Sequence, residues 1–294
     1  MTTLHRQSIE VAGLATRVIT GGSGTTPMVL LGGGTPGITP YCGGSHLWGQ
    51  SLQQLAKQAR VIALDFPGSG GTMPAPEPLT VASFVAHIGA TLGQLGVACC
   101  HLVGHDLGAL IALSLAIEQP QLAAAITVVA SPAAAPSGDV ARNITFDSPP
   151  EPLFSASSQR WALERISYSH HHVDDAFIDQ CVAVAKGPAH QLAGERMQAG
   201  EFDNAFAPSI NQAKARLFEF ARTHGFTMPV QLIWGSHDPL VSLDHGMWLF
   251  RLIAAKQRAT HFHLVNRAGN LVFRDDPQAF ARLIGAFREG LALT

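Results

Sequence analysis

The segment Gly104–Gly108, with the sequence Gly-His-Asp-Leu-Gly, constrains the fold more than any other part of the chain. It follows a continuous apolar run at 100–103 and precedes a helical pattern at 107–118, which halts at Pro120. A strand that passes into a helix over so few residues must turn sharply, so the flanking positions must be very small. We therefore expect Asp106 at the turn, raised to the carboxyl edge of a sheet, where open α/β sheets bind ligands.

Similar apolar runs recur along the chain and indicate strands that are covered on both faces. Helical patterns lie between them, over 81–95, 107–118 and 277–291. Strands that alternate with helices predict βαβ units and a mostly parallel, doubly wound sheet, an α/β fold. The runs span 28–31, 60–65, 100–103, 125–129, 229–234 and 261–265, and residues 9–19 predict two short antiparallel strands that meet at Gly13.

The alternation stops between about residues 133 and 227. This stretch begins with several prolines and continues with helical patterns around 159–166, 173–186 and 210–222. A helical insertion late in a doubly wound sheet predicts a lid over the active site. We expect a core made of 1–132 and 228–294, with a helical lid or cap at 133–227.

The net charge of −2 excludes a basic surface for nucleic acid, so a small-molecule substrate is expected. No apolar run reaches membrane-spanning length, and the first residues lack the apolar core of a signal peptide. These observations predict a cytoplasmic protein that does not bind membranes. A homo-oligomer is possible on this evidence.

Neither a metal nor a cofactor is expected. The four cysteines lack metal-ligand spacing, and we interpret them as reduced. Consecutive side chains such as His170–His172 cannot all face one ion. The glycines at 32–34 lack the spacing of a dinucleotide or phosphate loop.

The elbow and several later motifs resemble the α/β-hydrolase superfamily over nearly the whole chain. Most members have serine at the elbow; those with aspartate resemble epoxide hydrolases and haloalkane or haloacetate dehalogenases, in which the carboxylate attacks carbon and forms an ester. The stretches 32–37, 234–241 and 243–246 resemble carbon–carbon-bond hydrolases of ring-fission products. The resemblance implies a cofactor-independent hydrolase, active in aromatic compound catabolism on a small, largely apolar or aromatic-derived substrate.

The same resemblance assigns roles to single residues. It makes Asp106 the nucleophile and gives the oxyanion-binding role to the amides of Leu107 and of Gly33 or Gly34. Asp238 matches the acid that orients the catalytic base. Simpler interpretations are an N-cap for Asp106, a tight turn for the glycines and a turn aspartate at 238.

One position departs from the family pattern. The base is expected in a segment usually of the form Ala-Gly-His, but this chain has Ala-Gly-Asn, which places Asn270 at the histidine position. An amide has no nitrogen that titrates near neutral pH, so Asn270 can donate and accept hydrogen bonds but cannot deprotonate water.

Two chemical accounts remain open. If Asp106 attacks a substrate, the ester forms but hydrolyses poorly, as in an intermediate-trapping substitution at position 270. Alternatively, Asp106 is a general acid/base whose pKa is raised by an apolar pocket, and Asn270 orients the substrate. The second account suits a lyase, isomerase or cyclase, and loss of the base also suits a ligand-binding pseudoenzyme.

The expected substrate pocket also departs from the ring-fission hydrolases. Cys181 stands where they are expected to carry a carboxylate-binding arginine, and Leu271 stands where they have tryptophan. Both changes predict a more apolar substrate. We expect His105 to form a polar wall of the pocket, with Trp48 and Trp161 among its aromatic lining.

Overall fold

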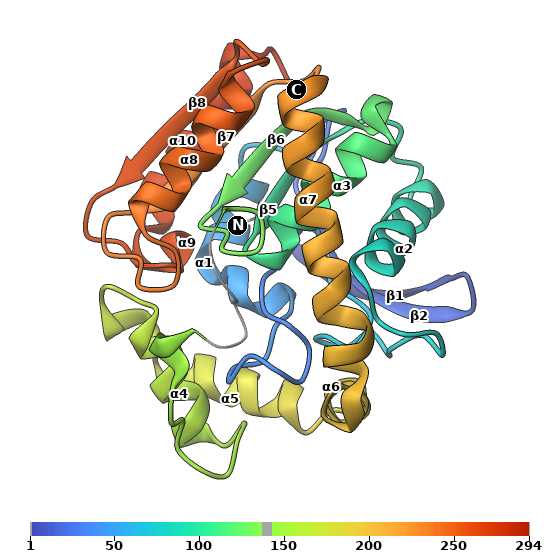
Figure 1. Ribbon diagram of the computed structural model, residues 1–294, viewed down its shortest axis with the longest axis vertical. Helices are drawn as coiled ribbons and strands as arrows, with labels where there is room; N and C mark the ends of the chain where they lie inside the picture. The colour runs from blue at the N-terminus through green and yellow to red at the C-terminus, as the bar shows by residue number, and fades with distance from the viewer. Residues whose placement is uncertain (1, 137–142, 294) are drawn as a thin grey trace.

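The computed structural model describes residues 2–136 and 143–293, and its centre is one eight-stranded sheet (Figure 1). The strand order is β1-β2-β4-β3-β5-β6-β7-β8, with β1 and β2 antiparallel to their neighbours and the other pairs parallel. The strands are β1 (Leu4–Val11), β2 (Leu14–Gly21), β3 (Met28–Leu31), β4 (Val61–Leu64), β5 (Cys100–His105), β6 (Ala123–Val129), β7 (Val230–Gly235) and β8 (Thr260–Val265).

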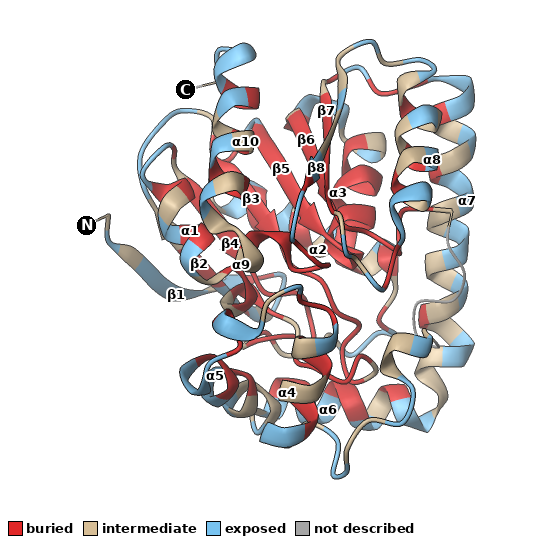
Figure 2. Cartoon of the chain, turned by 90° about the vertical axis from the view of Figure 1, so that its left-hand side faces the viewer, coloured by how far each residue is buried: buried red, intermediate tan, exposed pale blue. Residues whose placement is uncertain are grey.

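Helices cover both faces of this sheet, as a doubly wound fold requires (Figure 1). One face packs against α1 (Gly49–Ala56), α9 (Val272–Asp275) and α10 (Pro277–Gly290). The opposite face packs against α2 (Val81–Gln94), α3 (Leu107–Glu118), α7 (Ala207–Thr223) and α8 (Leu243–Ala254). The middle strands are buried throughout (Figure 2), which confirms that their unbroken apolar runs mark a sheet covered on both sides.

Three further helices lie beyond the carboxyl edge of the sheet: α4 (Ala156–Arg165), α5 (Asp175–Ala185) and α6 (Pro188–Arg196) (Figures 1 and 2). A π-helical segment, Met197–Phe206, joins α6 to α7. Helix α7 then runs back along α2 and α3, and its residues Leu217 and Ala221 are buried in the same apolar cluster. Part of the stretch expected to form the lid therefore packs on the core. The division of the chain into a core and a lid at residues 133 and 227 stays a prediction.

The sharp turn at the elbow depends on its glycines. Strand β5 ends at His105, Asp106 takes φ 49° and ψ −118°, and α3 begins at Leu107. A Cβ at Gly104 would collide with the Gly108 carbonyl oxygen, and a Cβ at Gly108 would collide with the Leu31 carbonyl oxygen. Because these obstacles are backbone atoms, only glycine lets α3 approach the sheet this closely.

Alanine at Gly108 is expected to lower the free energy of unfolding by about 1–3 kcal/mol, because the new methyl group must displace the β3 backbone. Gly93, an exposed residue of α2, is the matched control. A Cβ there meets nothing within 4 Å, so Gly93→Ala should raise the free energy of unfolding by about 0.5–1 kcal/mol. Urea unfolding followed by circular dichroism measures both; equal effects of the two substitutions would contradict the close packing described.

None of the helices within 2–136 and 143–293 is both long enough and apolar enough to cross a membrane. The four cysteines are free thiols; Cys99 is exposed and the other three are buried.

Candidate active site

The carboxylate of Asp106 is buried at the elbow, with only 3% of the residue exposed. Its Oδ2 accepts a hydrogen bond from the backbone N–H of Gly34 at 3.0 Å. Its Oδ1 is equally buried but has no hydrogen-bond partner among the described residues. One oxygen is therefore fixed by the loop after β3, while the other accepts no hydrogen bond from the described residues.

Burial raises the pKa of Asp106 from 3.8 to about 6, against the lowering effect of the Gly34 and Leu107 amides. At pH 7 the group is mainly ionised, yet it binds a proton more readily than an ordinary carboxylate. Such a pKa, close to neutrality, suits both a nucleophile and a general acid/base.

Backbone hydrogen bonds hold the elbow in its unusual conformation. A positive φ in a residue with a side chain costs on the order of 1–3 kcal/mol, so the surroundings must compensate. Here the Asp106 N–H donates to the Val129 carbonyl at 3.2 Å, and the Ser131 hydroxyl donates to the Asp106 carbonyl at 2.6 Å. Strand β6 and the loop after it therefore fix the direction of the carboxylate.

Asn270 lies in a chain of hydrogen bonds beside the elbow. Its Nδ2 donates to Asp238 Oδ2 at 2.9 Å and to the Ala130 carbonyl at 3.2 Å, which sets the orientation of the amide. Its Oδ1, 2.8 Å from His105 Nε2, must then be the acceptor. His105 accordingly carries its proton on Nε2, and both N–H groups of Asn270 are engaged.

His105 is a weak proton acceptor in this environment. Burial lowers the pKa of its imidazole to about 4, so the ring is neutral at physiological pH. Its Nδ1 has no partner among the described residues and lies against Gly33, where an added Cβ would be 2.6 Å from that nitrogen. The same Cβ would be 2.6 Å from the Cβ of Asp106, so Gly33 must be glycine to pack here.

Asp238 is the last member of this chain of hydrogen bonds. Its Oδ1 accepts hydrogen bonds from the N–H groups of Leu240 at 2.8 Å and Val241 at 3.1 Å. Burial raises the pKa of Asp238 to about 7, the negative charge of Asp106 adds to the rise, and the hydrogen bonds oppose it. The structure thus brings Asp106, Asp238, Asn270, His105 and the glycines at 33 and 34 together, and their roles stay predictions.

Two residues expected to contact substrate are instead buried behind the site. Trp48 is fully buried, with its ring 4.5 Å from that of Phe273 and 6.5 Å from that of His105, centroid to centroid. Leu271 is buried in the same apolar cluster. The Trp48 ring thus packs edge-on against His105.

The other two expected pocket residues make different contacts. Cys181 is buried, and its Sγ lies 3.5 Å from Nε2 of His46. Trp161 is half-buried, with the Arg165 guanidinium 4.3 Å above the centre of its ring. Their predicted contact with substrate stays untested.

Tyr41 is a site residue that the sequence analysis missed. It is 1% exposed, and a Cβ on Gly34 would lie 3.4 Å from its ring. Its pKa is raised well above the usual value by burial and then by the charges of Asp106 and Asp238. The sequence feature that could have identified Tyr41 is its position in the glycine-rich loop after β3, in a chain with only two tyrosines.

Comparisons with known proteins agree with this fold. The model of the alpha/beta hydrolase family matches residues 28–283. The chain is 25% identical over 281 residues to a 2-hydroxy-6-oxo-2,4-heptadienoate hydrolase of Pseudomonas putida, covering 95% of this chain and 94% of that protein. A crystal structure of a meta-cleavage product hydrolase superposes with a TM-score of 0.77 at 22% identity, covering 97% of this chain and 98% of the other.

A further relative is much longer than this chain. The dihydrolipoyllysine-residue acetyltransferase component of the acetoin cleaving system of Pseudomonas putida is 34% identical over 242 residues. The match covers 82% of this chain but only 60% of that protein. The chain therefore spans less than two thirds of this relative.

Proposed function

Because the chain belongs to the alpha/beta hydrolase family, we propose that it is a cofactor-independent enzyme in which the Asp106 carboxylate reacts with a small, largely apolar, aromatic-derived substrate. The observation that carries the proposal is the asymmetry of Asp106, with Oδ2 bound to the Gly34 amide and Oδ1 unpartnered. The meta-cleavage product hydrolase and the heptadienoate hydrolase among its relatives support the substrate class.

In the reaction that this arrangement suits best, Asp106 Oδ1 attacks an electrophilic carbon. A carbon–oxygen bond forms, the bond to the leaving group breaks, and the leaving group takes its electron pair. The product is an ester of Asp106, whose carbonyl oxygen Oδ2 lies at the Gly34 amide.

Hydrolysis of that ester is expected to be slow. A water molecule needs a base, but Asn270 has no proton-accepting nitrogen and its amide is engaged by Asp238, Ala130 and His105. The ester should therefore accumulate.

A panel of epoxides, haloacids and esters tests the proposal by intact-mass measurement after incubation. A compound that reacts should add its own mass, less that of any leaving group, to the protein. No mass increase with any compound, together with no turnover by Asn270→His, would overturn the nucleophile assignment.

The raised pKa of Asp106 favours a second candidate function, general acid/base catalysis of an isomerisation, elimination or ring closure. Here the carboxyl shuttles a proton and forms no ester. Conversion of a substrate without any adduct would support this candidate, and retained conversion by Asp106→Asn would remove Asp106 as the proton carrier.

The pH dependence of adduct formation tests whether the ionised carboxylate of Asp106 is the reacting form. Because the attacking group must be ionised, the rate of adduct formation should rise about tenfold per pH unit below pH 6 and level off above it. The rate constant is measured by mass spectrometry between pH 4.5 and 8.5. A rate that falls as the pH rises through 6 would instead identify the protonated carboxyl as the reacting form.

A further inference from the structure

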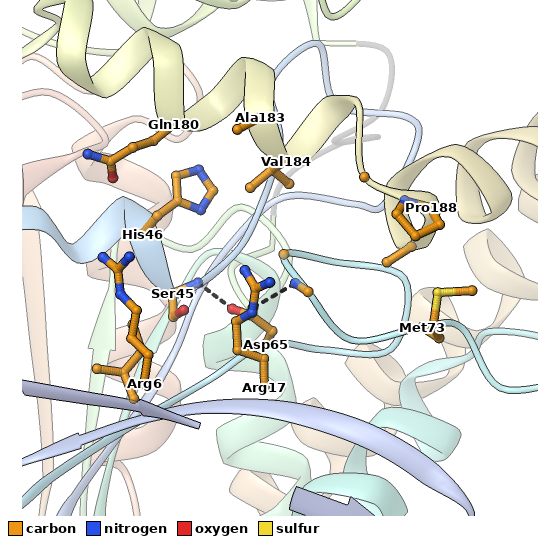
Figure 3. Close-up of a pocket in the computed structure, with 15 residues that line it drawn as sticks. Arg6, Arg17, Ser45, His46, Asp65, Met73, Gln180, Ala183, Val184 and Pro188 are labelled. Atoms are coloured by element: carbon orange, nitrogen blue, oxygen red, sulfur yellow. Dashed lines mark hydrogen bonds and ion pairs between the residues drawn. The ribbon is translucent and has the colours of Figure 1, made fainter. Parts of the chain in front are cut away.

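A cavity of about 430 Å³ lies between the N-terminal hairpin β1–β2 and helix α5 (Figure 3). Its lining contains neither Asp106 nor Asp238 nor Asn270, so it is distinct from the candidate active site. It shares Arg6, Ser45, His46 and Gln180 with an adjoining cavity of about 770 Å³. These volumes are in the range of small-molecule sites.

One wall of this cavity is basic. Arg6 pairs with Ile19 across the hairpin, and Arg17 lies two residues before Ile19 on β2. Since alternate residues of a strand share a face, both arginines project to the same side. Figure 3 shows both guanidinium groups extending from the strands toward the lid. In the described part of the chain, Arg6 has no ion pair or side-chain hydrogen bond.

The buried carboxylate of Asp65 neutralises only part of this charge. It lies 3.9 Å from the Arg17 guanidinium. Its oxygens already accept hydrogen bonds from the N–H groups of Ser45 at 2.7 Å and Gly71 at 2.8 Å. Gly71 also leaves room for the Arg17 side chain, since a Cβ there would collide with the guanidinium. Two positive groups thus face one negative group.

The charged residues of the adjoining cavity are engaged elsewhere. Arg274 donates to the carbonyl oxygens of Leu47 at 3.1 Å and His172 at 3.0 Å, and Asp174 caps α5. His46, between the cavities, adds no charge because burial and the nearby arginines lower its pKa to about 3.

The opposite wall belongs to the lid and is mostly apolar. Ala183 and Val184 of α5 face the hairpin, with Pro188 and Met73 beside them (Figure 3). Gln180 of α5 adds an amide above the basic wall. The cavity therefore combines a cationic side with an apolar side.

We propose that this cavity is a second binding site, for a small organic carboxylate with an apolar body. The carboxylate binds Arg6 and Arg17, whose planar guanidinium groups suit two-point recognition of carboxylates. The apolar body packs against Ala183 and Val184 of α5. A bound ligand would connect the core hairpin to the lid helix, and would stabilise the position of the lid.

Thermal unfolding of the whole protein with benzoate tests the site, with uncharged benzamide and inorganic phosphate as comparison ligands at matched ionic strength. Benzoate should raise the Tm by a few degrees in a saturable way, and the other two should raise it much less. Arg6→Gln should weaken the apparent benzoate affinity at least about tenfold. Arg251→Gln removes the same charge from exposed α8 and is the matched control.

An unchanged benzoate affinity in Arg6→Gln would overturn the proposal, since any binding would then lie elsewhere, including the site at Asp106. Equal losses in Arg6→Gln and Arg251→Gln would show only a general charge effect and would also overturn it. Stabilisation by phosphate equal to that by benzoate would overturn the role of the apolar wall. Arg6→Gln should still form the Asp106 adduct. Failure of the benzoate test would therefore leave the proposed function unaffected, and failure of adduct formation would leave the proposed binding site unaffected.

Discussion

Replacing Asp106 with asparagine is expected to lower the rate of adduct formation on the order of 10⁴-fold or more, because the amide nitrogen or oxygen is a far weaker nucleophile than the free Oδ1 carboxylate oxygen. The substitution keeps the shape of the side chain and can keep the hydrogen bond from the Gly34 amide. Intact-mass measurement after timed incubation gives the rate constants of both proteins.

Loss of the fold would mimic this result, so stability must be measured alongside. Asp106 is buried and its ionised form is penalised by burial, so Asp106→Asn should not lower the free energy of unfolding at pH 8. A stable variant that still forms the adduct at the original rate would exclude Asp106 as the nucleophile.

The second large effect is expected from Asn270→His, which should accelerate hydrolysis of the ester by about 10²–10⁴-fold. Asn270 Nδ2 already lies 2.9 Å from Asp238 Oδ2, so a ring nitrogen in its place would have an orienting carboxylate. The other ring nitrogen would then be available to activate water. Multiple-turnover assays with the compound that forms the adduct measure the gain.

Asn270→Ala is the matched control for this gain. It breaks the same hydrogen bonds to Asp238 and His105 but supplies no base. If Asn270→Ala and Asn270→His turn over equally fast, the absent imidazole is not what limits hydrolysis. The histidine variant should also accumulate less adduct than the unchanged protein.

The sheet was largely predictable from the sequence because its strands are buried on both faces. The run at 28–31 coincides with β3, and the two antiparallel strands meeting at Gly13 are β1 and β2. Helices α1 and α8 were not predicted. Their apolar residues lie on one side at least as clearly as those of α2 and α3, but both helices are less apolar overall, and the sequence analysis overlooked them.

The contacts within the site were harder to predict. The elbow is local in sequence, so its glycines identified Asp106 directly. The hydrogen bond between His105 and Asn270 joins residues 165 positions apart, and only the packed fold reveals it. It holds Nε2 of His105 at the Asn270 amide. The contact between Cys181 and His46 could not be predicted for the same reason, because the two residues are 135 positions apart.

Whether an aromatic side chain lines a pocket or packs in the core was hard to predict from the sequence. Trp48 is large and apolar, which suits a pocket wall as well as a core, and sequence alone does not separate the two. Its place beneath His105 follows from the packing of Phe273 of α9 and Phe280 of α10 against it. Tyr41 was overlooked because its loop has no periodic pattern, although its ring packs against Gly34.

Peptide mapping of the reacted protein tests the central claim most directly. After incubation with a compound that adds mass, the protein is digested and the modified residue is located by fragmentation. We predict that the added group is an ester on Asp106, absent from Asp106→Asn and lost faster from Asn270→His. An added group on any other residue, with Asp106 recovered unmodified, would contradict the account.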